Sequence, residues 1–242
     1  MKKVDEHSQV SANSLPSRGK VRKVALKIKV CGMRDLENIS GVVAALPDFL
    51  GFIFYPKSKR FVGFDPSPEI FAIVPESVIK IGVFVDETPE KVLETAQNCN
   101  LNVVQLHGHE TPEYCSLIKN SGITVFKAFS VDEHFDFNLL YAYSGVCDYF
   151  LFDSKGQLPG GTGQKFNWQL LENYIGDVPF FLSGGIGSED IDAISQFSHP
   201  QFFGIDINSG FEIAPALKDD EKVKNFISEI RDLESKYKEN SN

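Results

Sequence analysis

The chain has 242 residues, of which 42% are hydrophobic, and a formal net charge of −9 at neutral pH. This acidic balance disfavours a nucleic-acid partner, and no run of eighteen apolar residues is present that could span a membrane. The four cysteines, at positions 31, 99, 115 and 147, form no C-x-x-C pair, which argues against a zinc site and a disulfide scaffold and favours a reducing, cytoplasmic location.

The first 23 residues differ in composition from the rest of the chain. They hold six Lys or Arg residues against two acidic ones, few apolar residues and the turn-rich run SANSLPSRG. We therefore interpret residues 1–23 as a flexible N-terminal extension, and we find in them no apolar stretch of the kind that a secretory signal needs. Residues 24–242 remain for the folded domain.

From Val24 onward, short apolar runs alternate with amphipathic segments at a regular spacing. The predicted strands are 24–31, 47–54, 78–86, 101–107, 123–129, 147–153, 178–183 and 201–207. The helices between them are predicted to begin near Asp35, Pro66, Thr88, Thr111, Asp132, Asn167, Ser188 and Asp219. Eight strand–helix units in roughly 220 residues favour the α/β class and a single (β/α)8 TIM barrel, which typically takes about 250 residues. A doubly wound open sheet is the alternative, but its usual glycine fingerprint is missing.

The end of the first predicted strand carries a cysteine. Alternation along the strand puts Cys31 on the opposite face from Ile28 and Val30, and Gly32 then lets the backbone turn. A thiol at a strand end, with lysines nearby that favour its thiolate, suits an acid-base or nucleophilic role. On this stretch alone, a small buried core residue is the commoner outcome.

Polar residues gather at the other predicted strand ends as well. They are the loop 55–60, Asp86, Gln105, His107, Gly108, Asp153, the run 183–185, Asp206, Asn208, Ser209 and Gly210. Because active sites of TIM barrels lie at the C-terminal ends of the strands, this set predicts an active site. We expect His107 and His109 to form a hydrogen-bonding pair rather than a metal site. We expect the phenylalanines to fill the core, with Phe52 or Phe54 lining an aromatic substrate pocket as the alternative.

Three glycine-rich stretches follow the last predicted strands. SGGIGSED (183–190) and NSGFE (208–212) run toward helix starts, where exposed backbone N–H groups can bind an anion. Each alone could equally serve a tight turn, but adjacent loops of this kind favour phosphate binding. The third stretch, GQLPGGTGQKF (156–166), is long enough for a mobile lid, with an ordinary surface loop as the alternative.

Seven motifs in order carry a family resemblance. They are KVCGM (29–33), GFIFYPKSKRFV (51–62), GVFVDE (82–87), VQLHG (104–108), LFDSKGQLPGGTGQKFNW (151–168), LSGGI (182–186) and DINSGFE (206–212). The chain thereby resembles the phosphoribosylanthranilate isomerases of tryptophan biosynthesis. The resemblance implies a single barrel, an aldose–ketose type of isomerisation by Amadori rearrangement, and neither metal nor organic cofactor. It also implies a small phosphorylated substrate and a monomer or homodimer, with no nucleic-acid or membrane partner.

The resemblance assigns a role to each matching residue. Cys31 corresponds to the family's general base, which removes the C2′ proton of the ribose. Asp153 corresponds to the general acid, which protonates the furanose oxygen. Arg60 falls on the arginine that meets the anthranilate carboxylate. The phosphate-binding positions are Gly184, Gly185, Ser209 and Gly210, and the further substrate-binding positions are Asp206, Gln105 and His107.

Two positions depart from the family pattern. The family commonly has Asp where this chain has Asn167, and a glycine in the stretch that here reads Ala214 to Leu217, before Lys218 and Asp219. Both departures concern loop geometry and subunit contacts rather than the reacting groups. Other phosphosugar enzymes on this fold, and a phosphoribosyl-binding protein without activity, are the competing hypotheses. The first would carry aspartate or metal ligands in place of Cys31, and the second would lack Cys31 or Asp153.

Overall fold

Eight parallel strands close into a barrel in the computed structural model, which describes residues 25–101, 103–154 and 166–239. The strands are β1 (Lys27–Cys31), β2 (Phe49–Ile53), β3 (Ile79–Phe84), β4 (Val103–Leu106), β5 (Thr124–Val131), β6 (Tyr149–Ser154), β7 (Phe180–Leu182) and β8 (Phe202–Ile207). Each strand pairs with the next in the chain, and β8 pairs with β1. The predicted (β/α)8 barrel is confirmed, and each strand ends within two residues of its predicted end.

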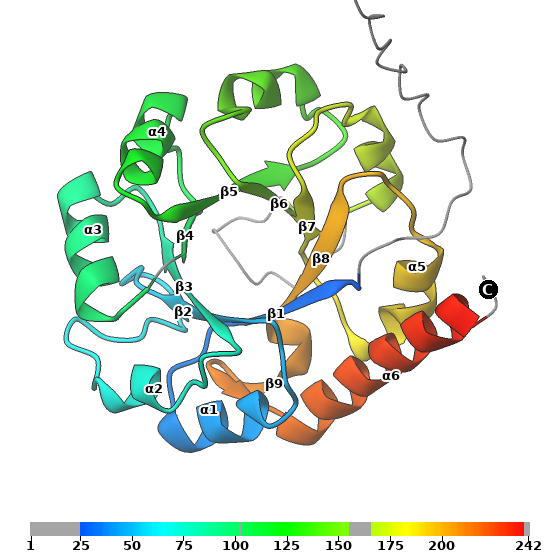
Figure 1. Cartoon of the computed structure of the whole chain (residues 1–242), viewed down its shortest axis with the longest axis horizontal. Helices are drawn as coiled ribbons and strands as arrows, with labels where there is room; N and C mark the ends of the chain where they lie inside the picture. The colour runs from blue at the N-terminus through cyan, green and yellow to red at the C-terminus, as the bar shows by residue number, and fades with distance from the viewer. Residues whose placement is uncertain (1–24, 102, 155–165, 240–242) are drawn as a thin grey trace, which may run out of the picture.

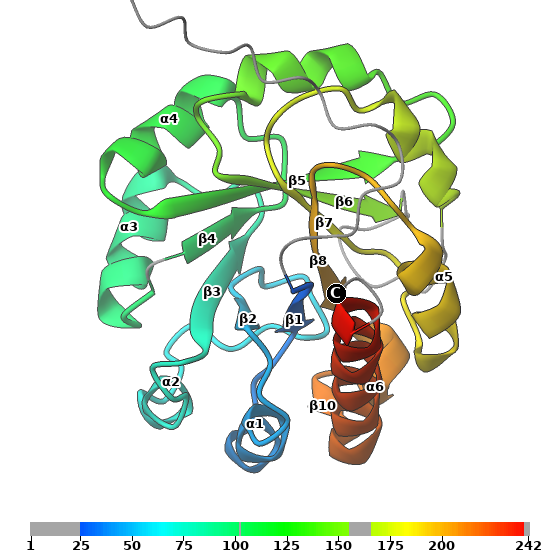
Figure 2. The same ribbon diagram turned by 45° about the vertical axis from the view of Figure 1, so that its right-hand side comes forward.

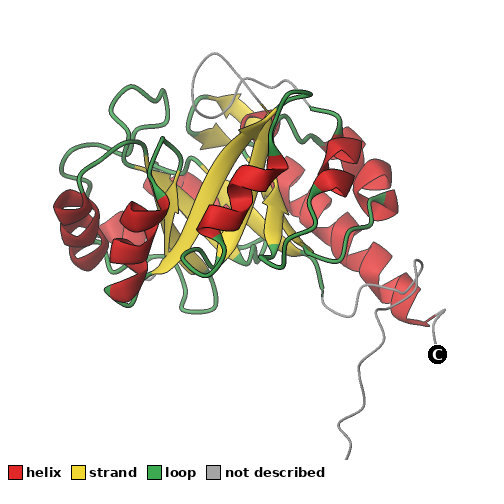
Figure 3. Cartoon of the chain, turned by 90° about the horizontal axis from the view of Figure 1, so that it is seen from above, coloured by secondary structure: helices red, strands yellow, loops and turns green. Residues whose placement is uncertain are grey.

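Helices surround the barrel on its outside (Figures 1 and 3). The α-helices are α1 (Leu36–Val43), α2 (Glu69–Ala72), α3 (Pro89–Asn98), α4 (Pro112–Asn120), α5 (Ile191–Gln196) and α6 (Asp220–Glu239). The 3-10 segments are η1 (Phe137–Tyr143), η2 (Trp168–Asn173), η3 (Ser188–Asp190) and η4 (Ser209–Phe211). A two-stranded hairpin, β9 (Glu212–Ala214) and β10 (Leu217–Lys218), links η4 to α6, which lies beside α1 (Figure 2).

The helix starts follow local capping chemistry. Thr88 and Thr111 each accept a hydrogen bond from the backbone N–H three residues later, at 3.3 Å, and each precedes a proline in the first turn. The segment predicted to begin near Asp132 starts instead at Phe137, because Asp136 provides the cap. Asp136 and Asn167 accept from the N–H only two residues later, a tighter turn that suits the 3-10 form found in the fifth and sixth units.

The apolar core has two layers, one outside and one inside the barrel. Alternate strand residues, such as Leu50 and Phe52, face the helices and form the larger layer. The smaller layer fills the barrel interior below the C-terminal ends and comprises Phe49, Ile81, Val103, Phe126, Ala128, Leu151 and Phe181. Phe181 packs against Phe49 and Phe126 with ring centroids 5.5 and 5.1 Å apart. Because these side chains fill the barrel interior, the barrel as described has room for a pocket only at the C-terminal ends of its strands.

Two predicted segments lie largely outside the residues that the structure describes. The N-terminal extension, residues 1–23, and all of the glycine-rich stretch 156–166 except Phe166 lie outside the described residues. Within the described ranges, none of the helices combines the length and apolar character needed to cross a membrane.

Candidate active site

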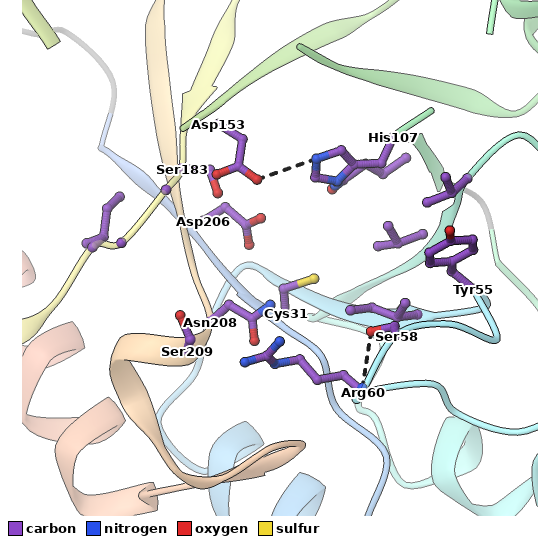
Figure 4. A pocket seen from close by; sticks show the side chains of 17 residues that line it. Cys31, Tyr55, Ser58, Arg60, His107, Asp153, Ser183, Asp206, Asn208 and Ser209 are labelled. Atoms are coloured by element: carbon purple, nitrogen blue, oxygen red, sulfur yellow. Dashed lines mark hydrogen bonds and ion pairs between the residues drawn. The ribbon is translucent and has the colours of Figure 1, made fainter. Parts of the chain in front are cut away.

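A pocket opens where the barrel strands end (Figure 4). Of the ten predicted site residues, nine line it: Cys31, Arg60, Gln105, His107, Asp153, Gly184, Gly185, Asp206 and Ser209. The tenth, Gly210, lies behind the lining, where a Cβ atom would come within 2.3 Å of the Ile186 carbonyl oxygen. Its lack of a side chain lets the loop after β8 lie against the loop after β7.

Cys31 is the last residue of β1 and is 3% exposed. Gly51 lies opposite it on β2, and a Cβ atom there would come within 2.8 Å of the Cys31 sulfur, so the glycine makes room for the thiol. Burial raises the pKa of Cys31 above its ordinary value, although Lys29 and Lys218 act in the opposite direction. The lysines thus favour the thiolate, as expected, but desolvation outweighs them in the free protein.

Lys29 and Asp206 form a buried ion pair below Cys31. They are register partners on β1 and β8, and Lys29 Nζ lies 2.9 Å from Asp206 Oδ2. Burial raises the pKa of the Asp206 carboxyl, partly opposed by Lys29, and the other carboxyl oxygen, Oδ1, has no hydrogen-bond partner among the described residues. Sequence reasoning missed Lys29, although its place two residues before Cys31 puts both side chains on the inner face.

Asp153 is on β6 and faces His107, at the end of β4. Asp153 accepts a hydrogen bond from Ser154 N–H through Oδ1 at 2.8 Å, and its Oδ2 lies 3.4 Å from His107 Nε2. That second contact lacks hydrogen-bond geometry, so it is an electrostatic contact only. Gln105 Nε2 lies 3.0 Å from His107 Nδ1 and is oriented to fix the ring. If the amide donates to Nδ1, His107 carries its proton on Nε2, toward Asp153.

The expected pairing of His107 with His109 is wrong. His109 points to solvent with a side chain 95% exposed and contacts Asp86, with 3.1 Å between its Nδ1 and Asp86 Oδ2. The positions are two apart but lie beyond the end of β4, where strand alternation no longer applies.

The pocket wall from β2 decides between the two readings of its phenylalanines. Phe52 and Phe54 pack in the outer core, as expected of the phenylalanines in general, and Phe54 stacks on Phe84 with ring centroids 5.1 Å apart. The alternative that one of them lines the pocket is wrong, because Ile53 and Tyr55 do so. Gly51 lies beside Cys31 and faces inward, so alternation along β2 turns Ile53 inward and Phe52 outward.

The loops after β7 and β8 line the pocket through Gly184, Gly185 and Ser209. Gly184 and Gly185 have φ angles of +90° and +67°, and a Cβ atom at Gly184 would meet Ser154 N at 2.5 Å. Gly184 therefore requires glycine, and the left-handed backbone at Gly185 favours it. Asp190 accepts from Gly187 N–H at 2.7 Å and braces the loop where it enters η3. Such a loop suits an anion with several oxygen atoms, such as a phosphate.

Arg60 reaches the pocket from the loop after β2 and is 8% exposed. Its guanidinium is paired side-on with Glu212, with 2.8 Å from Nε to Oε1 and 2.6 Å from Nη2 to Oε2. Glu212 was part of a quoted motif but was not predicted as a site residue. Lys218 was also missed, since its contacts depend on how distant loops meet. Tyr55, Ser58 and Asn208 were predicted among the polar residues at the strand ends, without a role of their own, and they do line the pocket.

The arrangement defines a class of enzyme: a (β/α)8-barrel enzyme for a phosphorylated substrate, with a thiol and a carboxylic acid at one pocket. The comparisons with known proteins give the family. Residues 28–229 match the family model described as N-(5'phosphoribosyl)anthranilate (PRA) isomerase. The chain belongs to this family and is an isomerase.

Relatives and solved structures agree with this assignment. The N-(5'-phosphoribosyl)anthranilate isomerase of Phocaeicola vulgatus is 48% identical over 204 residues, which cover 84% of this chain and 97% of the relative. That of Parabacteroides distasonis is 47% identical, with 84% and 92% covered. The crystal structure of the phosphoribosyl anthranilate isomerase from Thermotoga maritima superimposes with a TM-score of 0.75 at 36% identity, covering 86% of this chain and 99% of that one.

Proposed function

We propose that Cys31 and Asp153 are the general base and general acid of this chain's reaction. That reaction is the Amadori rearrangement of N-(5-phosphoribosyl)anthranilate to 1-(2-carboxyphenylamino)-1-deoxyribulose 5-phosphate in L-tryptophan biosynthesis. One observation carries the assignment of the residues: a thiol from β1 and a carboxyl group from β6 line the same pocket, beside glycine loops suited to phosphate. A structure of a family member in complex with reduced 1-(o-carboxyphenylamino)-1-deoxyribulose 5-phosphate, 34% identical with a TM-score of 0.73, supports the identity of the substrate and product.

The two groups act in sequence. Asp153 donates a proton to the furanose oxygen, the C1′–O bond breaks, and the nitrogen lone pair forms the C1′=N bond of a Schiff base. The Cys31 thiol loses its own proton to solvent and, as thiolate, removes the C2′ proton. The electrons of that C–H bond form the C1′=C2′ bond and the C=N π electrons return to nitrogen, which gives an enolamine, and Asp153 regains a proton from solvent after turnover. Proton transfer from the C2′ hydroxyl to C1′ completes the ketose. No atom is gained or lost, which is why acid-base groups suffice.

The protonation of Cys31 fits this order of events. Burial keeps the thiol neutral before substrate binds, as the direction of its pKa indicates. The Schiff base brings a positive charge next to the sulfur, and an adjacent cation favours the thiolate. The base would thus be strengthened at the step in which it acts.

The remaining residues bind and orient the substrate in this proposal. Arg60 meets the anthranilate carboxylate, and Gly184, Gly185, Ser209 and Gly210 hold the phosphate at the opposite side. Asp206, Gln105 and His107 contact the sugar between them. The buried oxygens Asp206 Oδ1 and Gln105 Oε1, without partners among the described residues, are acceptors suited to ribose hydroxyls.

The loss of anthranilate-type fluorescence on adding purified protein to phosphoribosylanthranilate tests the activity. We expect turnover without added metal or cofactor, and turnover that survives exhaustive chelation. A folded preparation without turnover would contradict the proposal.

For the cellular setting we propose a cytoplasmic enzyme, since all four cysteines are free and buried. For assembly we propose a monomer or homodimer; a related isomerase from Thermotoga maritima is described as dimeric.

A further inference from the structure

The Arg60 guanidinium is held by one edge only. A guanidinium has five N–H groups, and the side-on pairing with Glu212 uses the Nε edge. The other edge, formed by Nη1 and Nη2, can still bind a second carboxylate through two parallel hydrogen bonds. Within the part of the chain that the structure describes, Glu212 is the only acceptor hydrogen-bonded to this guanidinium.

Glu212 is in turn fixed by the β9–β10 hairpin on which it lies. Its Oε1 accepts from Lys218 Nζ at 2.7 Å and from Ala216 N–H at 3.1 Å. Lys218 Nζ also donates to Asn208 Oδ1 at 2.8 Å, which ties the hairpin to the loop after β8. The side chains of Glu212 and Lys218 are 6% and 0% exposed, so water cannot readily replace these contacts. The carboxylate can therefore hardly rotate without losing several hydrogen bonds.

The charges of this cluster favour an anion at the open edge. Arg60 and Lys218 share the single carboxylate of Glu212, so this carboxylate cannot neutralise both side chains. Burial lowers the pKa of Lys218, partly opposed by Glu212, so the guanidinium of Arg60 is the permanent cation beside the pocket. The Arg60 stem crosses Gly32, where a Cβ atom would come within 2.7 Å of Arg60 Cδ. The guanidinium is thereby directed from the β2 loop toward Asn208, close to the end of β1 that carries Cys31 (Figure 4).

We propose that Glu212 is a positioning residue that aims Arg60, and that the β9–β10 hairpin thereby determines specificity for a carboxylate on the aromatic ring. This inference rests on the proposed contact between Arg60 and that carboxylate. It also gives a role to the stretch 214–217, where the chain departs from the family pattern. Ala216 has a φ of +66°, a left-handed conformation that costs a residue with a Cβ atom, and its N–H contacts Glu212 directly.

The test compares two substrates: phosphoribosylanthranilate and the same phosphoribosylamine with an unsubstituted phenyl ring. Glu212→Gln keeps the shape of the side chain but removes its charge and one acceptor. We expect the preference in kcat/KM for the carboxylated substrate to fall by about tenfold or more, mainly through KM, as loss of hydrogen bonds to a charged group implies. For the unsubstituted ring, both constants should stay within about twofold of wild type.

Glu234→Gln is the matched control. Glu234 also accepts a backbone N–H, that of Leu26, and also faces an arginine, with 3.5 Å from its Oε2 to Arg231 Nη1, but at the opposite end of the barrel. We expect it to leave the preference unchanged. Should Glu212→Gln fail to fold, Glu212→Asp serves the same test, because the shorter side chain cannot keep all its contacts.

The outcomes separate the inference from the proposed function. A Glu212 variant that lowers kcat equally for both substrates, or leaves the preference intact, would overturn the positioning role. Arg60→Ala is measured in parallel. If it abolishes the preference while the Glu212 variant does not, the inference is wrong and the Arg60 contact stands. If Arg60→Ala leaves the preference intact, the proposed Arg60 contact itself is wrong.

Discussion

The two ends of the barrel treat buried polar groups in opposite ways. At the N-terminal end, Asp48 accepts from Lys27 Nζ at 2.7 Å, from Ile28 N–H at 2.9 Å and from Arg231 Nη2 at 2.6 Å. At the C-terminal end, Gln105 Oε1, His107 Nε2 and Asp206 Oδ1 are buried without a hydrogen-bond partner among the described residues. A buried polar atom without a partner destabilises a fold, so such atoms gathered in one pocket indicate a ligand that completes them.

The difference teaches that stability and reactivity are separable in this chain. At the N-terminal end, the charges of Asp48 and its partners are satisfied within the protein, whereas at the C-terminal end some buried polar atoms of the pocket stay available for the substrate. Substitutions at the two ends should therefore have opposite consequences.

The largest expected effect is on turnover at the C-terminal end. Cys31→Ala and Asp153→Ala should each lower kcat by about a hundredfold to ten-thousandfold, the usual contribution of a positioned acid or base. The thermal midpoint should change little, because neither side chain anchors the barrel. Steady-state kinetics and thermal unfolding of the same preparations check both statements. Near wild-type turnover in either folded variant would remove the role assigned to that residue.

A substitution at Asp48, at the N-terminal end, should lower stability and leave activity unchanged. Asp48→Ala removes three hydrogen bonds from two charged groups and a backbone N–H and should lower the free energy of unfolding by about 2–3 kcal/mol. Activity per folded molecule should be unchanged. Denaturant unfolding combined with kinetics on the folded fraction measures both, and a large loss of kcat would break the separation of the two ends.

Asp48 also predicts a pH dependence of stability. Burial alone would raise the pKa of this carboxyl, but hydrogen bonds from Lys27, Ile28 N–H and Arg231 outweigh burial and hold the pKa below its ordinary value. A lowered folded-state pKa means stabilisation that is fully present above the unfolded pKa of about 4 and lost as the pH falls through the folded pKa. Thermal midpoints measured from neutral to acidic pH should therefore fall less steeply in Asp48→Asn than in wild type.

A smaller effect concerns the free thiol of Cys31. Because burial raises its pKa, the substrate-free enzyme should show no thiolate from this residue at neutral pH. The thiolate ultraviolet absorbance of wild type minus that of Cys31→Ser should appear only above the ordinary thiol pKa. A midpoint below neutrality would mean that Lys29 and Lys218 outweigh burial after all.

The smallest effect is expected from the N-terminal extension. We propose that residues 1–22 contribute neither to the pocket nor to stability, because so polar a segment has little apolar surface to bury. Deleting them should leave kcat and the thermal midpoint unchanged. A clear drop in the midpoint alone would show that the extension stabilises the fold without serving catalysis.

Local pattern was enough to predict the barrel and most of its site. Each strand is short, apolar and followed by polar or glycine residues, and the fold rule that places strand ends together then collects Cys31, Asp153 and Asp206 in one pocket. Caps such as Thr88 and Thr111 could be predicted because the residues that make the hydrogen bond lie three positions apart.

What could not be predicted depends on contacts between distant segments. Lys29 meets Asp206 across 177 residues, and Arg60 meets Glu212 across 152, so neither pair has a signature within its own motif. The direction of the Cys31 pKa likewise required knowing how deeply the thiol is buried. The alternative that Phe52 or Phe54 lines the pocket was wrong by one position, which in a strand means the opposite face, whereas the expected core position is confirmed.

The most direct test of the account is to trap the Schiff base under single-turnover conditions. Each variant is mixed with phosphoribosylanthranilate, treated with borohydride, and analysed for the reduced open-chain amine above the background without enzyme. Cys31→Ala retains the acid and should open the ring and accumulate the reducible imine. Asp153→Ala should give none above background, because the furanose oxygen receives no proton. Imine in the Asp153 variant but not in the Cys31 variant would contradict the assignment of acid and base.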